Sequence, residues 1–292
     1  MVGLTDGELS AAIDPLGAQL SILQDADGHD LLWNGDPTIW SGRAPLLFPI
    51  VGVLAGGRYR LGSNTYALPR HGFARDRLFS VEAADGASAS LRLSADASTR
   101  QVYPFEFQLD LRYALIGATL SVRASIRNLG STDMPASFGY HPGFLWPLPY
   151  GEARAAHFIE FESDEPGRVR RIDNAGLLMP QHLATPVANR RLPLADELFR
   201  DDVLIFDQVK SRSVTYGGSR GPRLRVSFPD TPYLGCWSKP GAPFVCIEPW
   251  HGITDPQGFT GDFTEKPGVF LVQPASALEA RMDITLLKQG KH

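Results

Sequence analysis

Hydrophobic and polar positions alternate along many short stretches of this chain, a pattern typical of strands that are buried on one face. Between residues 107 and 113 the odd-numbered side chains are apolar and the even-numbered ones polar, and residues 120–126 repeat the pattern. Shorter alternating runs lie at residues 90–94, 224–228 and 282–286. We therefore predict an all-β protein, built as a large antiparallel β-sandwich with few short helices.

Turn-forming residues support this prediction. The chain contains 29 Gly and 23 Pro, spread over its whole length, which leaves little room for long helices. Tyr59 and Tyr66 flank the turn sequence Gly62-Ser63-Asn64, which predicts a β-hairpin. Residues 194–200 predict one short helical turn. A chain of 292 residues could form one domain or two, and we favour a single domain over residues 1–292, since β-sandwiches often reach this size.

Composition narrows the possible partners. A net charge of -4 argues against nucleic acid as the main partner, because phosphate backbones select strongly basic surfaces. The first residues show no charged leader followed by a long apolar stretch, so we expect neither a signal peptide nor a membrane span. We therefore expect the protein to be cytoplasmic. The two cysteines, Cys236 and Cys246, are expected to be buried thiols. The sequence leaves open whether the protein is a monomer or a homodimer.

Three segments combine an ionisable side chain with glycine, proline and an aromatic residue: residues 68–77, 139–144 and 247–252. The first contains His71 and Arg75, and a guanidinium near an imidazole is unfavourable unless an anionic or oxygen-rich partner compensates. His141, in the second, is expected at a strand end because Pro142 stops ladder pairing. Each histidine also has a purely structural interpretation. Together the three segments favour one composite site for a polyhydroxylated or anionic small molecule.

Glu248 lies in the third segment, directly after the apolar run 244–247 and before Pro249 and Trp250. Carboxylates are seldom placed at such positions for stability, because their desolvation is costly. Partial burial should raise the pKa of Glu248 and make it a stronger base. The alternative is a structural salt bridge with an arginine. Trp250, like Trp146 and Trp237, is either a sugar-stacking platform or part of the core, and the core is favoured for any one of them.

Other chemistries fit the sequence less well. It contains no phosphate-binding P-loop and no G-x-G-x-x-G. It also lacks an H-x-H or H-E-x-x-H pair that would supply closely spaced metal ligands. We therefore expect neither a metal nor an organic cofactor.

In their order and spacing, four segments resemble the aldose 1-epimerase (galactose mutarotase-like) superfamily, and within it the LacX-like branch. These segments are Phe48–Gly52, His71–Arg75, His141–Phe144 and Glu248–Ile253. The similarity extends over almost the whole chain, from about residue 14 to residue 287. It implies a galactose mutarotase-like supersandwich that holds a sugar in a cleft on one sheet, and a cofactor-independent isomerase that interconverts the α and β anomers of an aldose.

The resemblance also implies roles for individual residues. Glu248 matches the general base of the family and His141 the general acid. His71 matches a second histidine that holds the substrate near the ring oxygen, and Arg75 a substrate-binding arginine. Asp202 falls where the family has a hydroxyl-binding aspartate, although the neighbouring Asp201 competes for that assignment.

One departure from the family pattern concerns the substrate. Phosphosugar epimerases of this superfamily carry an arginine in an R-G-G-x-P arrangement, whereas residues 40–45 here read WSGRAP, with Arg43 displaced. Arg43 is a further substrate-binding candidate, and we expect a free aldohexose as substrate. The alternatives are a hexose-6-phosphate 1-epimerase and a non-catalytic carbohydrate-binding module on the same fold.

Overall fold

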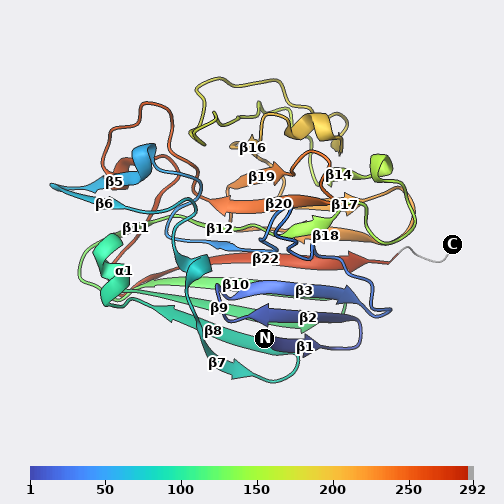
Figure 1. The fold of residues 1–292 in the computed structure, drawn as a ribbon, viewed down its shortest axis with the longest axis horizontal. Coiled ribbons are helices and arrows are strands. Elements are labelled where there is room, and N and C mark those ends of the chain that lie inside the picture. Colours follow the sequence, from blue (N-terminus) through green and yellow to red (C-terminus); the bar gives the residue numbers. More distant parts are fainter. Residues whose placement is uncertain (289–292) are drawn as a thin grey trace.

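The computed structural model describes residues 1–288, and antiparallel strands make up most of its regular structure (Figure 1). The largest sheet has nine strands in the order β15-β14-β17-β18-β22-β10-β9-β8-β7. Their bounds are β7 (Ser80–Ala84), β8 (Ser88–Ser94), β9 (Phe107–Ile116), β10 (Thr119–Asn128), β14 (Phe158–Phe161), β15 (Arg191–Pro193), β17 (Ser213–Gly217), β18 (Arg223–Ser227) and β22 (Ala277–Leu287).

A second sheet of six strands carries the order β16-β19-β20-β12-β4, and β13 also pairs with β20. Its strands are β4 (Leu46–Leu47), β12 (Phe138–Tyr140), β13 (Gly143–Leu145), β16 (Leu204–Phe206), β19 (Tyr233–Trp237) and β20 (Phe244–His251). In Figure 1 this sheet runs above β22 and β10 of the large sheet. Tyr140 of β12 joins the two layers, because its hydroxyl donates to the carbonyl of Ala280 on β22 at 2.9 Å.

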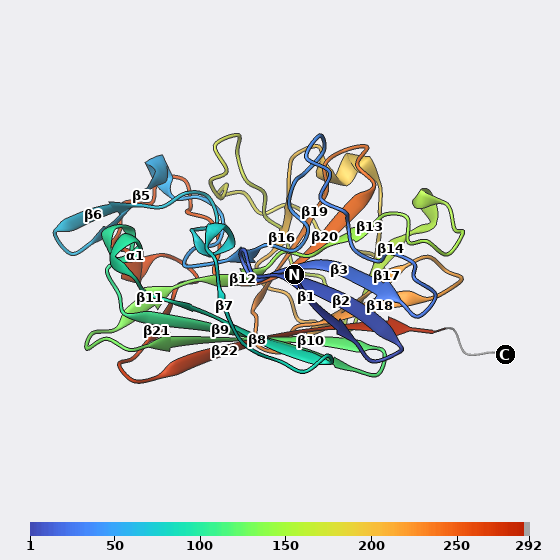
Figure 2. The same ribbon diagram turned by 60° about the horizontal axis from the view of Figure 1, so that its bottom comes forward.

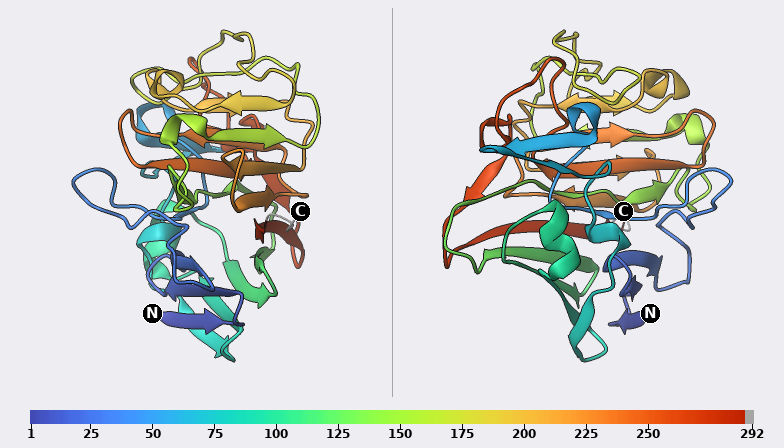
Figure 3. Two further views of the ribbon diagram at one scale, coloured as in Figure 1. Left: turned by 90° about the vertical axis from the view of Figure 1, so that its right-hand side faces the viewer. Right: turned by 60° about the vertical axis from the view of Figure 1, so that its left-hand side comes forward.

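Smaller elements surround the two sheets. The N-terminal strands form a three-stranded sheet next to β8 and β9 (Figure 2). Figure 3 shows that these blue strands and the yellow segment with β16 lie at opposite ends of the molecule. The remaining strands and helices are β1 (Val2–Thr5), β2 (Leu9–Asp14), β3 (Gln19–Asp25), β5 (Arg58–Leu61), β6 (Asn64–Ala67), β11 (Met134–Ala136), β21 (Phe270–Val272), α1 (Ala97–Val102), and the 3-10 turns η1 (Ala55–Gly57), η2 (Ala74–Asp76), η3 (Arg154–Ala156), η4 (Asp196–Phe199) and η5 (Phe263–Glu265).

The alternating runs in the sequence form the strands that they predict. In β9 the odd-numbered residues are buried and the even-numbered ones more exposed, and β8, β10, β18 and β22 cover the other predicted runs. Tyr59 and Tyr66 face each other across the predicted hairpin β5–β6, and η4 lies in the predicted helical turn. The prediction of an all-β fold is confirmed. The sequence did not indicate α1, whose first turn is closed by a reciprocal pair of hydrogen bonds between Asp96 and Thr99.

The two faces of β20 contact different surroundings. Val245 and Ile247 belong to the large core between the sheets, whereas Cys246, Glu248 and Trp250 lie on the opposite face. Because both faces are covered, β20 reads as a nearly continuous apolar run rather than an alternating one. A carboxylate on this strand is therefore buried, and the site is built on this face of the six-stranded sheet.

Candidate active site

His141 and Glu248 are brought together by strand register. His141 and Pro142 lie between β12 and β13, and both of these strands pair with β20. The register is the same on both sides of the break, with Gly139 opposite Trp250 and Gly143 opposite Cys246, so His141 faces Glu248 across the gap. Pro142 cannot donate a ladder hydrogen bond, which explains the break.

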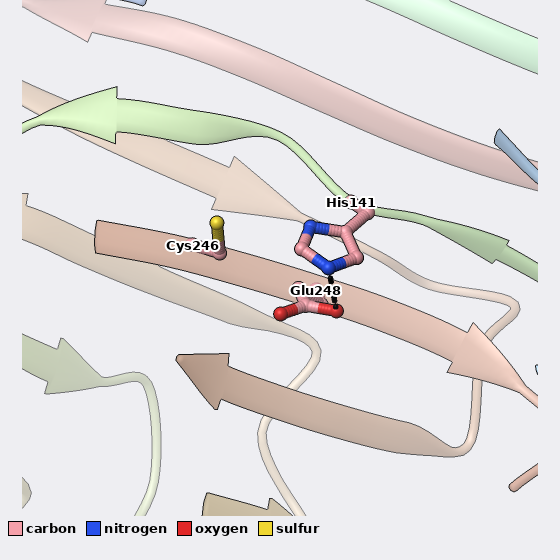
Figure 4. A group of neighbouring side chains, drawn as sticks. All are labelled: His141, Cys246 and Glu248. Carbon is pink, nitrogen blue, oxygen red and sulfur yellow. Dashed lines mark ion pairs between the residues drawn. The ribbon is translucent and has the colours of Figure 1, made fainter. Parts of the chain in front are cut away.

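The two side chains are in direct contact in the interior (Figure 4). His141 Nε2 lies 3.2 Å from Glu248 Oε2, and the side chains are 10% and 2% exposed, respectively. Burial raises the pKa of Glu248 well above its usual range, and the nearby Asp202 raises it further. Burial lowers the pKa of His141 to about 3, and the charges of Arg75 and Arg70 add to this effect. The low-polarity surroundings therefore favour a neutral imidazole beside a protonated carboxyl, with one proton available for exchange between them.

His71 lies beside this pair, its ring centre 5.8 Å from that of His141 and nearly perpendicular to it. Its Nδ1 accepts the N–H of Gly52 at 3.1 Å, so in the neutral ring Nε2 carries the proton. Burial lowers the pKa of His71 well below its usual value, and His141, Arg75 and Arg70 act in the same direction. His71 is therefore a neutral hydrogen-bond donor.

The loop that presents His71 has little freedom. His71 and Gly72 both have positive φ angles, 66° and 73°. A side chain at Gly72 would place its Cβ only 2.2 Å from the carbonyl oxygen of Phe48. The N–H of Phe73 donates to that same oxygen at 3.0 Å. These contacts explain why the segments Phe48–Gly52 and His71–Arg75 form one unit, since each fixes the backbone of the other.

The site opens into a cavity of about 630 Å³, within the range usual for small-molecule sites. Two tryptophans form its wall beside His141. The ring of Trp40 lies 5.2 Å from the His141 ring at an angle of 30°, and Trp237 meets that ring edge-on at 5.9 Å. Flat indole faces beside polar groups suit a pyranose, which has apolar C–H faces and a polar rim.

Six of the seven predicted site residues line this cavity: His71, Arg75, His141, Asp202, Glu248 and Trp250. Of the two adjacent aspartates Asp202 is the one in the lining, held in a left-handed conformation with φ of 61°. Its side chain accepts the N–H of Val203 at 2.7 Å, while its own carbonyl accepts from Arg171.

Arg43 is the exception. Its Nε donates to the carbonyl of Asn34 at 2.7 Å and its Nη1 reaches the carbonyl of Ser21 at 3.4 Å. The guanidinium thus closes the loop around Gly35, where it packs against the backbone, and it is not part of the cavity lining. Arg43 therefore lies outside the site, and its prediction as a substrate-binding residue is wrong.

Sequence reasoning missed other lining residues. Arg70 lies in the cavity and packs against Gly176, and its place directly before His71 was the available signal. Trp40 and Gln19 also line the cavity. Trp40 begins the segment 40–45 that departs from the R-G-G-x-P arrangement, but nothing there marks its indole as a binding group, and no motif surrounds Gln19. Trp237, for which the sequence left a sugar-stacking and a core role open, lines the cavity as well.

Comparison with known proteins identifies the family to which this double-layered antiparallel sandwich belongs. The family model for aldose 1-epimerase matches residues 1–260. The chain belongs to the aldose 1-epimerase family, as its motifs predicted.

Individual relatives are similar over their whole length. The LacX protein of Lactococcus lactis subsp. lactis, in its plasmid and chromosomal forms, is 33% identical over 296 residues, which covers 98% of this chain and 99% of LacX. The crystal structure of a galactose mutarotase related enzyme from Lactobacillus acidophilus has a TM-score of 0.91 at 29% identity, covering 99% of this chain and 98% of the other. A galactose mutarotase-like protein from Lactobacillus casei ATCC 334 gives 0.92 at 28% identity, covering 98% and 100%. The predicted galactose mutarotase-like fold is confirmed.

The longest α-helix within residues 1–288 spans six residues, and none there has the length and apolar character that crossing a bilayer requires.

Proposed function

We propose that this protein is an aldose 1-epimerase that interconverts the α and β anomers of an aldohexose by acid–base ring opening. The observation that carries the proposal is the contact of 3.2 Å between His141 Nε2 and Glu248 Oε2 at the floor of a sugar-sized cavity. Ring opening of a hemiacetal requires one group that removes the proton of the anomeric hydroxyl and another that protonates the ring oxygen. A carboxyl and an imidazole in one site can supply both.

In the proposed reaction Glu248 accepts the proton of the anomeric hydroxyl while His141 donates a proton to the ring oxygen, and the bond between C1 and the ring oxygen breaks. The aldehyde rotates about the C1–C2 bond and closes on its other face, with the two residues exchanging roles. The reactive imidazolium and carboxylate form from the resting neutral pair when the Glu248 proton moves to His141 Nε2 across the 3.2 Å contact. Ring opening then returns the pair to a neutral imidazole and a carboxylic acid. Burial favours that neutral state, because it raises the pKa of Glu248 and lowers that of His141.

His71 is placed to support this step. Its protonated Nε2 is a donor that needs no positive charge, so it can hold the ring oxygen or a neighbouring hydroxyl without opposing the proton transfer from His141. Asp202 in the lining supplies an acceptor for sugar hydroxyls. The proposed reaction uses only these side chains and requires no cofactor.

Polarimetry on freshly dissolved α-glucose and α-galactose tests the proposal. The protein should accelerate the change in optical rotation, and Glu248→Gln should reduce kcat by roughly 10²–10⁴-fold, the usual contribution of a positioned acid or base. Glu197→Gln, an exposed glutamate on η4, is the matched control and should leave the rate unchanged. Equal rates for Glu248→Gln and wild type would show that Glu248 is not the base. Sugar binding in a calorimeter without any acceleration would instead indicate a carbohydrate-binding module.

A second candidate, a hexose-6-phosphate 1-epimerase, is favoured by Arg70 and Arg75, which both line the cavity. Within residues 1–288, Arg75 has only the exposed Asp76 as an ion-pair partner, at 3.8 Å, and no carboxylate pairs with Arg70. Two cations in a cavity are compensated by an anionic substrate. A rate preference for glucose 6-phosphate over glucose that disappears in Arg75→Ala, and not in Arg43→Ala, would establish it. The absence of any preference would exclude it.

A further inference from the structure

A third side chain with ligand chemistry lies beside the His141–Glu248 pair. Cys246 precedes Glu248 by two residues on β20, and the two-residue period of a strand places both on the same face (Figure 4). The ligand atoms of His141, Cys246 and Glu248 all lie within 4.8 Å of one another, and all three residues are buried. The acid–base chemistry proposed above has no use for the thiol.

We propose that His141, Cys246 and Glu248 form a binding site for a soft divalent cation such as Zn²⁺ or Cd²⁺ at the floor of the cavity. An imidazole nitrogen, a thiolate and a carboxylate are the three ligand types that zinc takes in proteins. Three protein ligands with a fourth position open to solvent or substrate are the arrangement of catalytic zinc sites. His141 and Glu248 line the cavity and Cys246 does not, so a fourth ligand would reach the cation from the cavity side.

The present geometry is close to what coordination requires. With metal–ligand bonds of about 2.0–2.2 Å, nitrogen and oxygen ligands of a tetrahedral site stand roughly 3.3 Å apart. The separation of His141 Nε2 and Glu248 Oε2 is 3.2 Å, so this edge of the tetrahedron is already formed. The longest separation in the group, at most 4.8 Å, needs to shorten by about 1 Å, which a small side-chain rotation provides.

Charge also favours the cation. Binding removes the proton of the Cys246 thiol and the proton held by Glu248, and both protons leave to solvent. The complex of a divalent cation with one thiolate, one carboxylate and a neutral imidazole carries no net charge, which suits a buried position. Hard cations such as Mg²⁺ prefer six oxygen ligands and retain water, so they should not occupy this site.

Occupancy of the site has a functional consequence, which rests on the proposed function. A bound cation takes the lone pairs of Glu248 and His141 that acid–base ring opening uses. The cation should therefore inhibit mutarotation reversibly, and a chelator should restore the rate. Binding itself is independent of turnover and can be measured without a sugar.

The chain offers a matched control for the thiol. Its only two cysteines are Cys236 and Cys246. Cys236 pairs with Ile247 across β19 and β20, so it lies on the opposite face of the sheet from Glu248, within the large core. A second cluster, formed by Asp25, Asp27 and His29 near the surface, contains no thiol. Absorption from a cadmium–thiolate bond therefore reports on Cys246 alone.

The experiment is a titration of the reduced full-length protein with Cd²⁺, followed by the ultraviolet absorption of the cadmium–thiolate bond. Wild type and Cys236→Ala should bind one equivalent. Cys246→Ala should lose the band, and Glu248→Gln should weaken binding by roughly 100-fold, since even outer partners of metal ligands change affinity by 10–100-fold. Mg²⁺ should give no response.

Circular dichroism verifies that each variant is folded. If Cys246→Ala does not fold, Glu248→Gln still tests the site, because glutamine has nearly the same shape as glutamate. A band that persists in Cys246→Ala, equal affinity in Glu248→Gln and wild type, or no band in the wild type would overturn the proposal. A wild type that binds Cd²⁺ but shows no mutarotase activity would contradict the proposed function and leave the metal site supported.

Discussion

Replacing Glu248 by Gln should stabilise the fold, by an amount that increases with pH. The side chain is 2% exposed, and burial raises the pKa of its carboxyl. Glutamine has nearly the same shape, and its amide can donate to His141 Nε2 or accept from it, so the contact at 3.2 Å is retained. The substitution therefore removes the titrating proton and little else.

The sign follows from proton binding. In the unfolded chain a glutamate loses its proton near pH about 4.3. The folded protein retains this proton to higher pH, so above the unfolded pKa the native state binds more protons than the unfolded state. Wild-type stability consequently falls as pH rises, by about 1.4 kcal/mol per pH unit, until the folded pKa is reached. The stability of Glu248→Gln does not fall with pH in this way, because glutamine does not titrate. The folded pKa of His141, lowered to about 3, has the opposite effect, but it is common to both proteins and largely cancels in the difference.

Urea unfolding monitored by tryptophan fluorescence measures this difference over a pH series from about 5 to about 8. Glu106→Gln is the control, because hydrogen bonds from Arg100 lower the pKa of this exposed carboxyl, and its substitution should shift stability in the opposite direction. Parallel pH profiles for wild type and Glu248→Gln would refute the reasoning, since they would mean that folding does not raise the pKa of Glu248.

Two further predictions concern the His71 loop. Gly72→Ala should lower the free energy of unfolding by about 3–5 kcal/mol in urea titrations, because the new Cβ meets the carbonyl of Phe48 at 2.2 Å in a left-handed conformation. The control is Gly86→Ala, which has the same sign of φ but open space around the new Cβ and should cost only about 1–2 kcal/mol. Equal losses in the two variants would contradict the contact argument. His71→Asn should retain the fold, because asparagine tolerates positive φ and can accept the N–H of Gly52, but kcat/KM measured by polarimetry should fall about 10–100-fold through loss of the Nε2 donor. An unchanged kcat/KM with normal thermal unfolding would show that His71 does not contact the sugar.

Much of the site could be predicted because the relevant residues lie in local motifs. His71 and Arg75 share one loop, His141 precedes a proline and Glu248 follows an apolar strand, and each position has a local physical reason. Arg43 was predicted to bind substrate because it lies close to the position of the arginine in the R-G-G-x-P arrangement. Its guanidinium instead donates hydrogen bonds to the carbonyls of Asn34 and Ser21. Hydrogen bonds that a loop makes with itself depend on its turns, which motif spacing does not describe.

Strand periodicity and turn residues alone determine that this chain folds into antiparallel sheets, because alternation with a period of two is a property of neighbouring residues. Tertiary structure decided which strands pair and in what register. That register places His141 opposite Glu248, brings Trp40 against the imidazole, and sets Cys246 on the same face as the pair. Contacts between residues far apart in the chain arise only when two layers pack, and the sequence pattern of either layer does not contain them.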